Sequence, residues 1–314
     1  MLRTGLLVLA MIMAVSPAWA VSAPAESVSI PAWVKGGNCA ADPEFNATLN
    51  GKPVSITSTL APGSDQITLL VFDLTGSLST MAVAKKAVIA AISKLPRNTW
   101  VGLLRDQNGL HVLVDPGPKR RPVIAAIQSF SNNGDPGLLE TVDSTLSLAD
   151  AIVRRAAVRV SVVYLTDANI YSYREDYTNP VINPSDRYDL SRVIPGALIE
   201  DKISNLLEGL RSLEAPLFVV QIQSWGDPMN EVYESGLVRL AAATGGRAEI
   251  CHSDGEIPDA VAAIFGQIAG AWRLTLAVPP RTHRHLQIHL GAACSKGDVR
   301  LSWRTDMYQK GRQP

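Results

Sequence analysis

The sequence has little of several features that define common classes of protein. It contains three cysteines in 314 residues, too few for a disulfide scaffold. Its 29 basic and 29 acidic residues leave no net charge, which argues against nucleic acid and against an anionic membrane surface as the main partner. After the amino terminus, no apolar run reaches the roughly 20 residues of a membrane-spanning helix. We therefore expect a protein with no integral membrane segment.

The amino terminus has the pattern of a secretory leader. Arg3 precedes an apolar run over residues 5–15 and the small-residue sequence AWA at 18–20. This predicts a signal peptide over residues 1–20, cut after Ala20. Valine rather than cysteine follows, which argues against a lipoprotein anchor. We expect an exported protein, periplasmic or secreted, with Cys39 and Cys294 as the favoured disulfide pair and Cys251 left over.

Strand-like and helix-like segments alternate through the middle of the chain. Buried strands are predicted around residues 67–73, 159–167 and 216–223, with helices between them, and asparagine-glycine pairs at 50–51 and 108–109 predict hairpins. The pattern predicts an α/β fold, a doubly wound and mostly parallel sheet. Its expected bounds are 65–272, with a β appendage over 21–64 and a β extension over 273–314 that could pair with each other.

Two of the predicted strands end in an aspartate. The sequence ITLLVFD ends at Asp73, and Thr75 and Ser77 follow it at alternate positions; VSVVYLTD ends at Asp167. Ligands bind at the carboxyl edge of open α/β sheets, and carboxylate and hydroxyl oxygens suit a hard cation such as Mg²⁺ or Mn²⁺. Aspartate and serine before a helix are also common as helix caps, so the loop alone does not decide the question.

The sequence LVRLAAATGGRAEI at 237–250, together with the two aspartate-ended strands, resembles the von Willebrand factor type A domain, in particular that of bacterial exported proteins. The resemblance covers about 65–272 and implies a Rossmann-like domain with a metal-ion-dependent adhesion site. Carried over, the ligands are Asp73, Thr75 in place of serine, Ser77 and Asp167. The second-loop threonine is the departure: aligning LLETVDSTL with the family's helix, with one inserted residue, puts Asp135 in its position and Thr141 inside the helix.

The implied function is cation-dependent protein binding and adhesion without catalysis, in which the cation coordinates an acidic side chain of the partner. Two interpretations of the tyrosine-rich segment 168–194 stay open: its tyrosines add contact area for the protein ligand, or they pack the loop onto the domain. Its four tyrosines are Tyr171, Tyr173, Tyr177 and Tyr188.

Three alternatives stay open. The altered second loop allows a metal-free interaction scaffold with the same fold. The sequence LLVFDLTGS also resembles the first motif of haloacid dehalogenase-type phosphohydrolases, but Thr75 stands where that family needs its acid and base carboxylate. The third is a zinc site, since His283, His285 and His289 lie on one face of a predicted strand, although exposed positions of an edge strand explain them at least as well.

Overall fold

The computed structural model describes residues 26–35, 43–170, 172–173, 194–222, 230–280, 282–293 and 300–309. The predicted signal peptide lies outside these ranges, as do Cys39, Cys294 and three of the four loop tyrosines, Tyr171, Tyr177 and Tyr188. Within the described ranges, no helix has both the length and the apolar character needed to cross a membrane.

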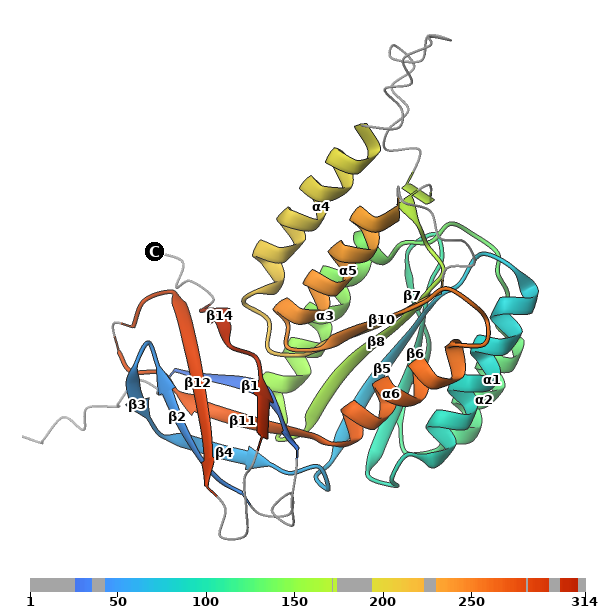
Figure 1. Cartoon of the computed structure of the whole chain (residues 1–314). Helices are drawn as coiled ribbons and strands as arrows, with labels where there is room; N and C mark the ends of the chain where they lie inside the picture. The colour runs from blue at the N-terminus through green and yellow to red at the C-terminus, as the bar shows by residue number, and fades with distance from the viewer. Residues whose placement is uncertain are drawn as a thin grey trace, which may run out of the picture.

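A six-stranded sheet forms the centre of the molecule (Figure 1). Its strands, in spatial order, are β10 (Arg247–Cys251), β9 (Leu217–Ile222), β8 (Arg159–Thr166), β5 (Gln66–Asp73), β6 (Thr99–Asp106) and β7 (Leu110–Gly117). All neighbours are parallel except β6 and β7, which form the hairpin predicted at Asn108 and Gly109. β5 is buried at every position except Ile67. The apolar run therefore forms a central strand, as the sequence predicts.

Helices cover both faces of this sheet (Figure 1). One face packs against α1 (Leu78–Lys94), α2 (Arg120–Ser129) and α6 (Ile257–Ala269). The other packs against α3 (Leu138–Arg155), α4 (Ile194–Leu210) and α5 (Glu231–Ala243). The strands contribute alternate side chains to the two apolar cores, because successive residues of a strand point to opposite faces. The predicted doubly wound α/β fold is confirmed.

The two flanks of the chain form one β-sandwich. Its first sheet has the order β13 (Arg300–Trp303), β1 (Ser27–Lys35), β11 (Ala271–Ala277), β4 (Ile56–Leu60), and its second the order β14 (Asp306–Tyr308), β12 (His285–Ala293), β2 (Glu44–Leu49), β3 (Lys52–Val54). Apolar residues of both sheets, including Ile30, Leu49, Leu274 and Ile288, share a third core. The amino-terminal and carboxyl-terminal β segments thus bury each other's apolar faces, with β11 beginning at Ala271.

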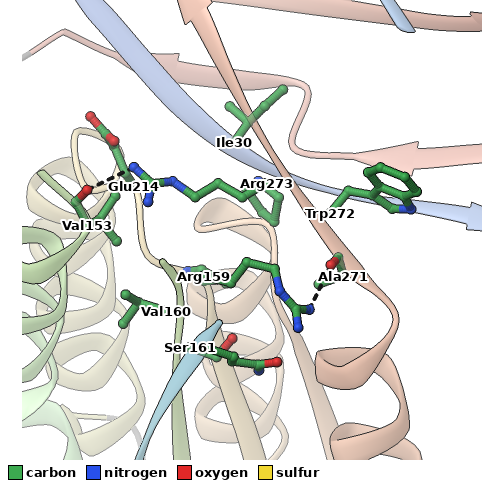
Figure 2. Close-up of a pocket in the computed structure, with 12 residues that line it drawn as sticks. Ile30, Val153, Arg159, Val160, Ser161, Glu214, Ala271, Trp272 and Arg273 are labelled. Carbon is green, nitrogen blue, oxygen red and sulfur yellow. Dashed lines mark hydrogen bonds between the residues drawn. The ribbon is translucent and has the colours of Figure 1, made fainter. Parts of the chain in front are cut away.

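Three arginines fix the amino-terminal edge of the central sheet, where the helices of an α/β fold end. Arg273 of β11 donates to carbonyl oxygens at the end of α3, including that of Val153 at 2.8 Å (Figure 2). Arg304, between β13 and β14, donates to those of Leu210, Arg211 and Leu213 at the end of α4. Arg159 of β8 donates to the end of α6. Carbonyls at a helix carboxyl terminus lack partners within the helix and carry partial negative charge, so each guanidinium satisfies them.

The sequence Thr-Gly-Gly after α5 makes a turn against the start of β9. Thr244 is buried, and its hydroxyl accepts a hydrogen bond from the amide of Leu217 at 2.8 Å. Gly245 has a φ of +82°, which favours glycine, and a Cβ on Gly246 would lie 1.8 Å from the carbonyl oxygen of Leu217. The Thr-Gly-Gly sequence is therefore required because the backbone between α5 and β10 lies in direct contact with the start of β9.

We expect Gly246→Ala to lower the free energy of unfolding by about 3 kcal/mol, because the added methyl forces the backbones of β9 and β10 apart. Gly266→Ala is the matched control: it lies in α6 with open space around its Cβ position, and alanine there should stabilise by about 0.5–1 kcal/mol. Urea unfolding measures both. Equal stability of the Gly246 variant and the wild type would contradict the packing described for this turn.

Candidate functional site

Three neighbouring strands of the central sheet end in or beside an aspartate at the carboxyl edge. Asp73 ends β5, Asp106 ends β6, and Asp167 directly follows β8. β5 lies between the other two strands, so its carboxylate is flanked on both sides. The loop from residue 74 to 77 then leads into α1. The sequence predicts Asp73 and Asp167 as site residues, and the order of the strands places Asp106 beside them.

Asp73 is completely buried and its two oxygens have different partners. Oδ1 accepts a hydrogen bond from the amide of Gly137 at 2.9 Å, and Oδ2 accepts one from the hydroxyl of Thr166 at 2.7 Å. Burial and repulsion by Asp106 and Asp167 raise the pKa of the Asp73 carboxyl well above its usual range, although both hydrogen bonds favour the charged form. A carboxylate oxygen has two lone pairs, so each still has capacity for another partner.

Asp167 holds the loop that follows β5. Its Oδ1 accepts from the amide of Thr75 at 2.8 Å and from the Thr75 hydroxyl at 3.4 Å, and its Oδ2 accepts from the amide of Gly76 at 2.7 Å. A Cβ on Gly76 would lie 2.8 Å from Oδ2, which explains the glycine there. Burial raises the pKa of Asp167, against these three bonds. Asp167 thus links the end of β8 to the loop that follows β5.

Ser77 is the exposed member of the predicted set. Its hydroxyl lies 2.6 Å from that of Ser79, which is also exposed, and the backbone carbonyl of Ser77 begins the hydrogen bonding of α1. The side chain of Ser77 makes no hydrogen bond to the α1 backbone, so it is not acting as a helix cap. The alternative that these residues serve only as caps therefore does not describe Ser77.

Asp106 is the site residue that the sequence reasoning missed. It is fully buried, and its Oδ2 accepts a hydrogen bond from the hydroxyl of Thr141, which also contacts Tyr164. Its Oδ1 is buried with no hydrogen-bond partner among the described residues, and a Cβ on Gly137 would approach it to 2.6 Å. The signal was present: WVGLLRD is a third strand-like run ending in aspartate. Its position beside β5 depends on strand order, which a sequence does not give.

Burial raises the pKa of the Asp106 carboxyl from 3.8 to about 6. A carboxyl whose pKa is higher in the folded state binds its proton more tightly there. The contribution of protonated Asp106 to the free energy of unfolding is therefore fully present below about pH 4 and is lost as the pH rises through about 6. We expect Asp106→Asn, which cannot ionise, to lose this dependence. In chelator, its stability relative to wild type should rise by about 2 kcal/mol between pH 4.5 and 7.5, measured by urea unfolding. A constant difference would contradict the electrostatic role given to Asp106.

Asp135, predicted for the second-loop position, lies apart from the other four in its hydrogen bonding. It is exposed, and its backbone makes two hydrogen bonds with Asn108. The amide of Asp135 donates to Oδ1 of Asn108, and the amide of Asn108 donates to the carbonyl of Asp135, both at 3.0 Å. The residue of this loop that contacts Asp73 is Gly137, through its amide. Thr141 lies inside α3, as the alignment implies, and its hydroxyl binds Asp106. Ligation by Asp135 remains a prediction.

Tyr173 does not provide the exposed contact area expected of the tyrosine-rich segment. Only 4% of its surface is exposed, its hydroxyl accepts the amide hydrogen bond of Leu139 at 3.3 Å, and its ring packs on Tyr233. Because the amide of Leu139 is in the first turn of α3, Tyr173 satisfies a donor that the helix leaves free. For Tyr173 the structure therefore shows the alternative, in which the tyrosine packs its loop onto the domain. The other three tyrosines of the segment are outside the described residues.

The histidines and the buried cysteine have other partners. His285 and His289 lie on β12, where His285 pairs with Asp306 at 3.2 Å and His289 packs against Trp303, whereas His283 precedes the strand. Cys251 is a free thiol whose pKa burial raises to about 12. In the described ranges, no three His, Cys, Asp or Glu side chains are placed to hold a metal ion. The zinc alternative gains nothing from the structure.

A cation at the aspartate-rich edge would therefore have to use hydroxyl oxygens beside carboxylates, as the D-x-T-x-S pattern implies. The donor set fits such an ion in three respects. All candidate donors of Asp73, Thr75, Ser77 and Asp167 are oxygens, which hard divalent cations prefer. Among the ion pairs of the described residues, none includes Asp73, Asp106 or Asp167. The buried Oδ1 of Asp106 adds negative charge close to the set.

The fold and the site together define a class: a doubly wound α/β domain, joined to a β-sandwich, with a carboxylate and hydroxyl site at the carboxyl edge of its central strand. No family model and no curated protein sequence matches the chain. Its structure is similar to those of von Willebrand factor type A domain proteins, at sequence identities that describe the fold alone.

The similar structures include a von Willebrand factor type A protein from Catenulispora acidiphila, 14% identical, covering 85% of this chain and 72% of that one with a TM-score of 0.46. The PilB minor pilin from Streptococcus sanguinis, as a D319A mutant, is 12% identical, with 78% and 79% covered and a TM-score of 0.48. Proximal thread matrix protein 1 of the mussel byssus, described with a zinc-occupied MIDAS motif, is 13% identical, with 69% and 48% covered and a TM-score of 0.44. This chain spans about half the length of the mussel protein.

Proposed function

We propose that the chain is an exported protein-binding module, not an enzyme, whose carboxyl-edge site holds a divalent cation such as Mg²⁺ or Mn²⁺. The observation that carries the proposal is the convergence of Asp73, Asp106 and Asp167, all wholly or largely buried, at three adjacent strand ends with no cationic side chain paired to any of them in the described structure. Like charges held together in this way favour a cation, because each raises the cost of ionising the others.

The residues of this chain have separate parts in the proposed site. Thr75 and Ser77 offer hydroxyl oxygens, and Ser77 is exposed to an approaching partner. Asp73 supplies buried negative charge, and Asp167 fixes the loop through the amides of Thr75 and Gly76. Bound there, a hard cation would attract a carboxylate of the partner protein. The chemistry proposed is thus recognition of an acidic side chain.

The absence of a second carboxylate at Thr75 supports binding over phosphoryl transfer. In the haloacid dehalogenase pattern that position carries the proton donor. Here the Thr75 hydroxyl is engaged with Asp167 at 3.4 Å and the Thr75 amide is fixed on the same carboxylate at 2.8 Å. Neither group is suited to deliver a proton to a leaving oxygen.

One observation favours the metal-free scaffold as a second candidate. Every carboxylate oxygen of Asp73 and Asp167 already accepts a hydrogen bond, two of them from the loop amides of Thr75 and Gly76 and one from the amide of Gly137. In this alternative the aspartates serve to hold loops and the amino terminus of α3 in place. The two candidates differ in one property, the binding of a cation.

Ser77→Ala tests the proposal with little risk to the fold, since Ser77 is exposed and its hydroxyl contacts only that of Ser79 among the described residues. We expect this variant to bind Mn²⁺ at least about 10-fold more weakly, because one oxygen ligand is lost. Enhancement of water proton relaxation by bound Mn²⁺ measures the affinity, and added glutarate should reduce the enhancement by taking the position meant for a partner's carboxylate.

Ser79→Ala is the matched control, since it removes the neighbouring exposed hydroxyl, 2.6 Å away, while leaving the proposed ligands in place. Its Mn²⁺ affinity should equal that of the wild type. Equal affinities of all three proteins would exclude Ser77 as a ligand, and no enhancement with folded wild type would favour the scaffold.

A further inference from the structure

Three asparagine-glycine pairs lie within the described residues, and asparagine is chemically least stable when glycine follows it. The backbone nitrogen of the following residue can attack the side-chain Cγ of asparagine and close a succinimide ring, and a residue without a side chain hinders this attack least. The sequence is the same at all three places, so only the structure distinguishes them. The pairs are Asn50-Gly51, Asn108-Gly109 and Asn133-Gly134.

The first two pairs are held in hairpin turns. All four residues have positive φ values, as the tightest hairpin turns require. Oδ1 of Asn50 accepts a hydrogen bond from the amide of Gln287 at 2.7 Å, and its Nδ2 donates to the carbonyl of His285 at 3.2 Å. Oδ1 of Asn108 accepts one from the amide of Asp135 at 3.0 Å. In both hairpins, therefore, side-chain hydrogen bonds must break before Cγ can approach the glycine nitrogen.

The third pair has none of these restraints. Asn133 is exposed, its φ is not positive, and its side chain makes no hydrogen bond to any described residue. The amide of Gly134, which is the attacking group, also donates no hydrogen bond within the described ranges. Gly134 is itself required, because its φ is +115° and a Cβ there would lie 2.7 Å from Nδ2 of Asn108. The reactive pair is thus exposed, and its glycine is fixed by the structure.

Asn133 lies in the second loop of the proposed cation site. Its neighbour Asn132 donates from Nδ2 to the carbonyl of Gly76 at 2.8 Å, and the amide of Gly137 donates to Asp73 at 2.9 Å. The loop is therefore bound, on both sides of Asn133, to the segment that carries the proposed ligands. A change of charge at Asn133 occurs within a loop of that site.

We propose that Asn133 is a site of spontaneous deamidation. The nitrogen of Gly134 forms a bond to Cγ of Asn133, the bond from Cγ to Nδ2 breaks, and ammonia leaves with the proton of the Gly134 amide. Water then opens the succinimide and gives aspartate or isoaspartate. The net reaction adds water and releases ammonia, without oxidation or reduction. The product carries one more negative charge, and the isoaspartyl form also has an additional methylene in the backbone of the second loop.

Peptide mapping by mass spectrometry tests this on the folded mature protein, sampled over time in mildly alkaline buffer. In urea, all three asparagines should react at similar rates. In the folded protein, Asn133 should keep a rate close to its rate in urea, whereas Asn50 and Asn108 should react at least about 10-fold more slowly than in urea, because their hairpins must open first. Asn133→Gln should remove the fast reaction. If Asn133 reacts no faster than the two hairpin asparagines in the folded protein, the proposal is overturned.

The effect of deamidation on the cation site rests on the proposed function and has its own test. Asn133→Asp supplies the aspartyl product, and we expect it to bind Mn²⁺ about 3-fold more tightly, because a negative charge is added near the cation. Asn205→Asp is the matched control, since it adds the same charge at an exposed position of α4. Equal affinities of wild type and both variants would overturn this effect. No Mn²⁺ binding by any of them would contradict the proposed function instead, whereas the mapping alone decides the site of deamidation.

Discussion

Arg304→Met is expected to lower the free energy of unfolding by about 4 kcal/mol. Arg304 is 2% exposed, and its guanidinium donates to the carbonyls of Leu210, Arg211 and Leu213, while its Nε donates to that of Asp306 at 3.1 Å. Methionine fills much of the same volume but removes four donated hydrogen bonds; the carbonyls of Leu210 and Arg211 keep the amides of Leu213 and Tyr308, whereas the carbonyl of Leu213 loses its donor. Each buried carbonyl left without a partner costs about 1–3 kcal/mol.

Arg300→Met is the control for this substitution. Arg300 is on β13 in the same sheet of the β-sandwich, but it is exposed, so the change should alter stability by less than about 0.5 kcal/mol. Urea unfolding followed by tryptophan fluorescence measures both variants. A loss below about 1 kcal/mol for the Arg304 variant would show that this arginine is not what fixes the β-sandwich to α4.

Asp73→Asn should weaken binding of Mg²⁺ by about 100-fold, the larger of the two effects expected on the site. Asparagine keeps the shape of the side chain and can still accept the hydrogen bond of Thr166 or of Gly137, while the buried negative charge is removed. The same change should raise stability in chelator, because burial and the neighbouring carboxylates penalise ionised Asp73. A substitution that lowers Mg²⁺ affinity but raises the free energy of unfolding is the result expected of a site in which binding is gained at a cost to stability.

Asp135→Asn, measured in the same Mg²⁺ titration, tests whether Asp135 is a ligand of the cation. Asp135 is exposed and is held through its backbone by Asn108, so its carboxylate is not needed for the loop. Affinity unchanged by this substitution would remove Asp135 from the ligand set, and a fall of about 10-fold or more would place it there. If neither aspartate variant changes Mg²⁺ affinity, the charge-based account of the site is contradicted.

The fold was predictable because its signals are local. A run of buried strand residues such as 67–73, helical periodicity over 80–94 and the asparagine-glycine hairpins each depend on neighbouring residues alone. The Thr-Gly-Gly turn is also recognisable from the sequence, since only glycine fits against the carbonyl of Leu217. These features fix the alternation of strands and helices, and with it the class of fold.

The rest of the site depends on contacts between distant residues. Asp106 joins Asp73 only because β6 lies beside β5, and the second loop contacts Asp73 through the backbone amide of Gly137. A backbone donor leaves no signature in side-chain identity. Likewise, the sequence shows Tyr173 as one tyrosine among four, and its burial against α3 follows from packing alone. Strand order, loop approach and burial are therefore what the structure adds.

Calorimetric titration of Mg²⁺ into the metal-stripped mature protein tests the central claim most directly, with Mn²⁺ as the second ion. The account predicts saturable binding at one site per chain, lost or weakened about 100-fold in Asp73→Asn and unaffected in Ser79→Ala. No heat of binding from either ion, in a sample shown by circular dichroism to be folded, would contradict the cation mechanism and leave the α/β domain as a metal-free scaffold.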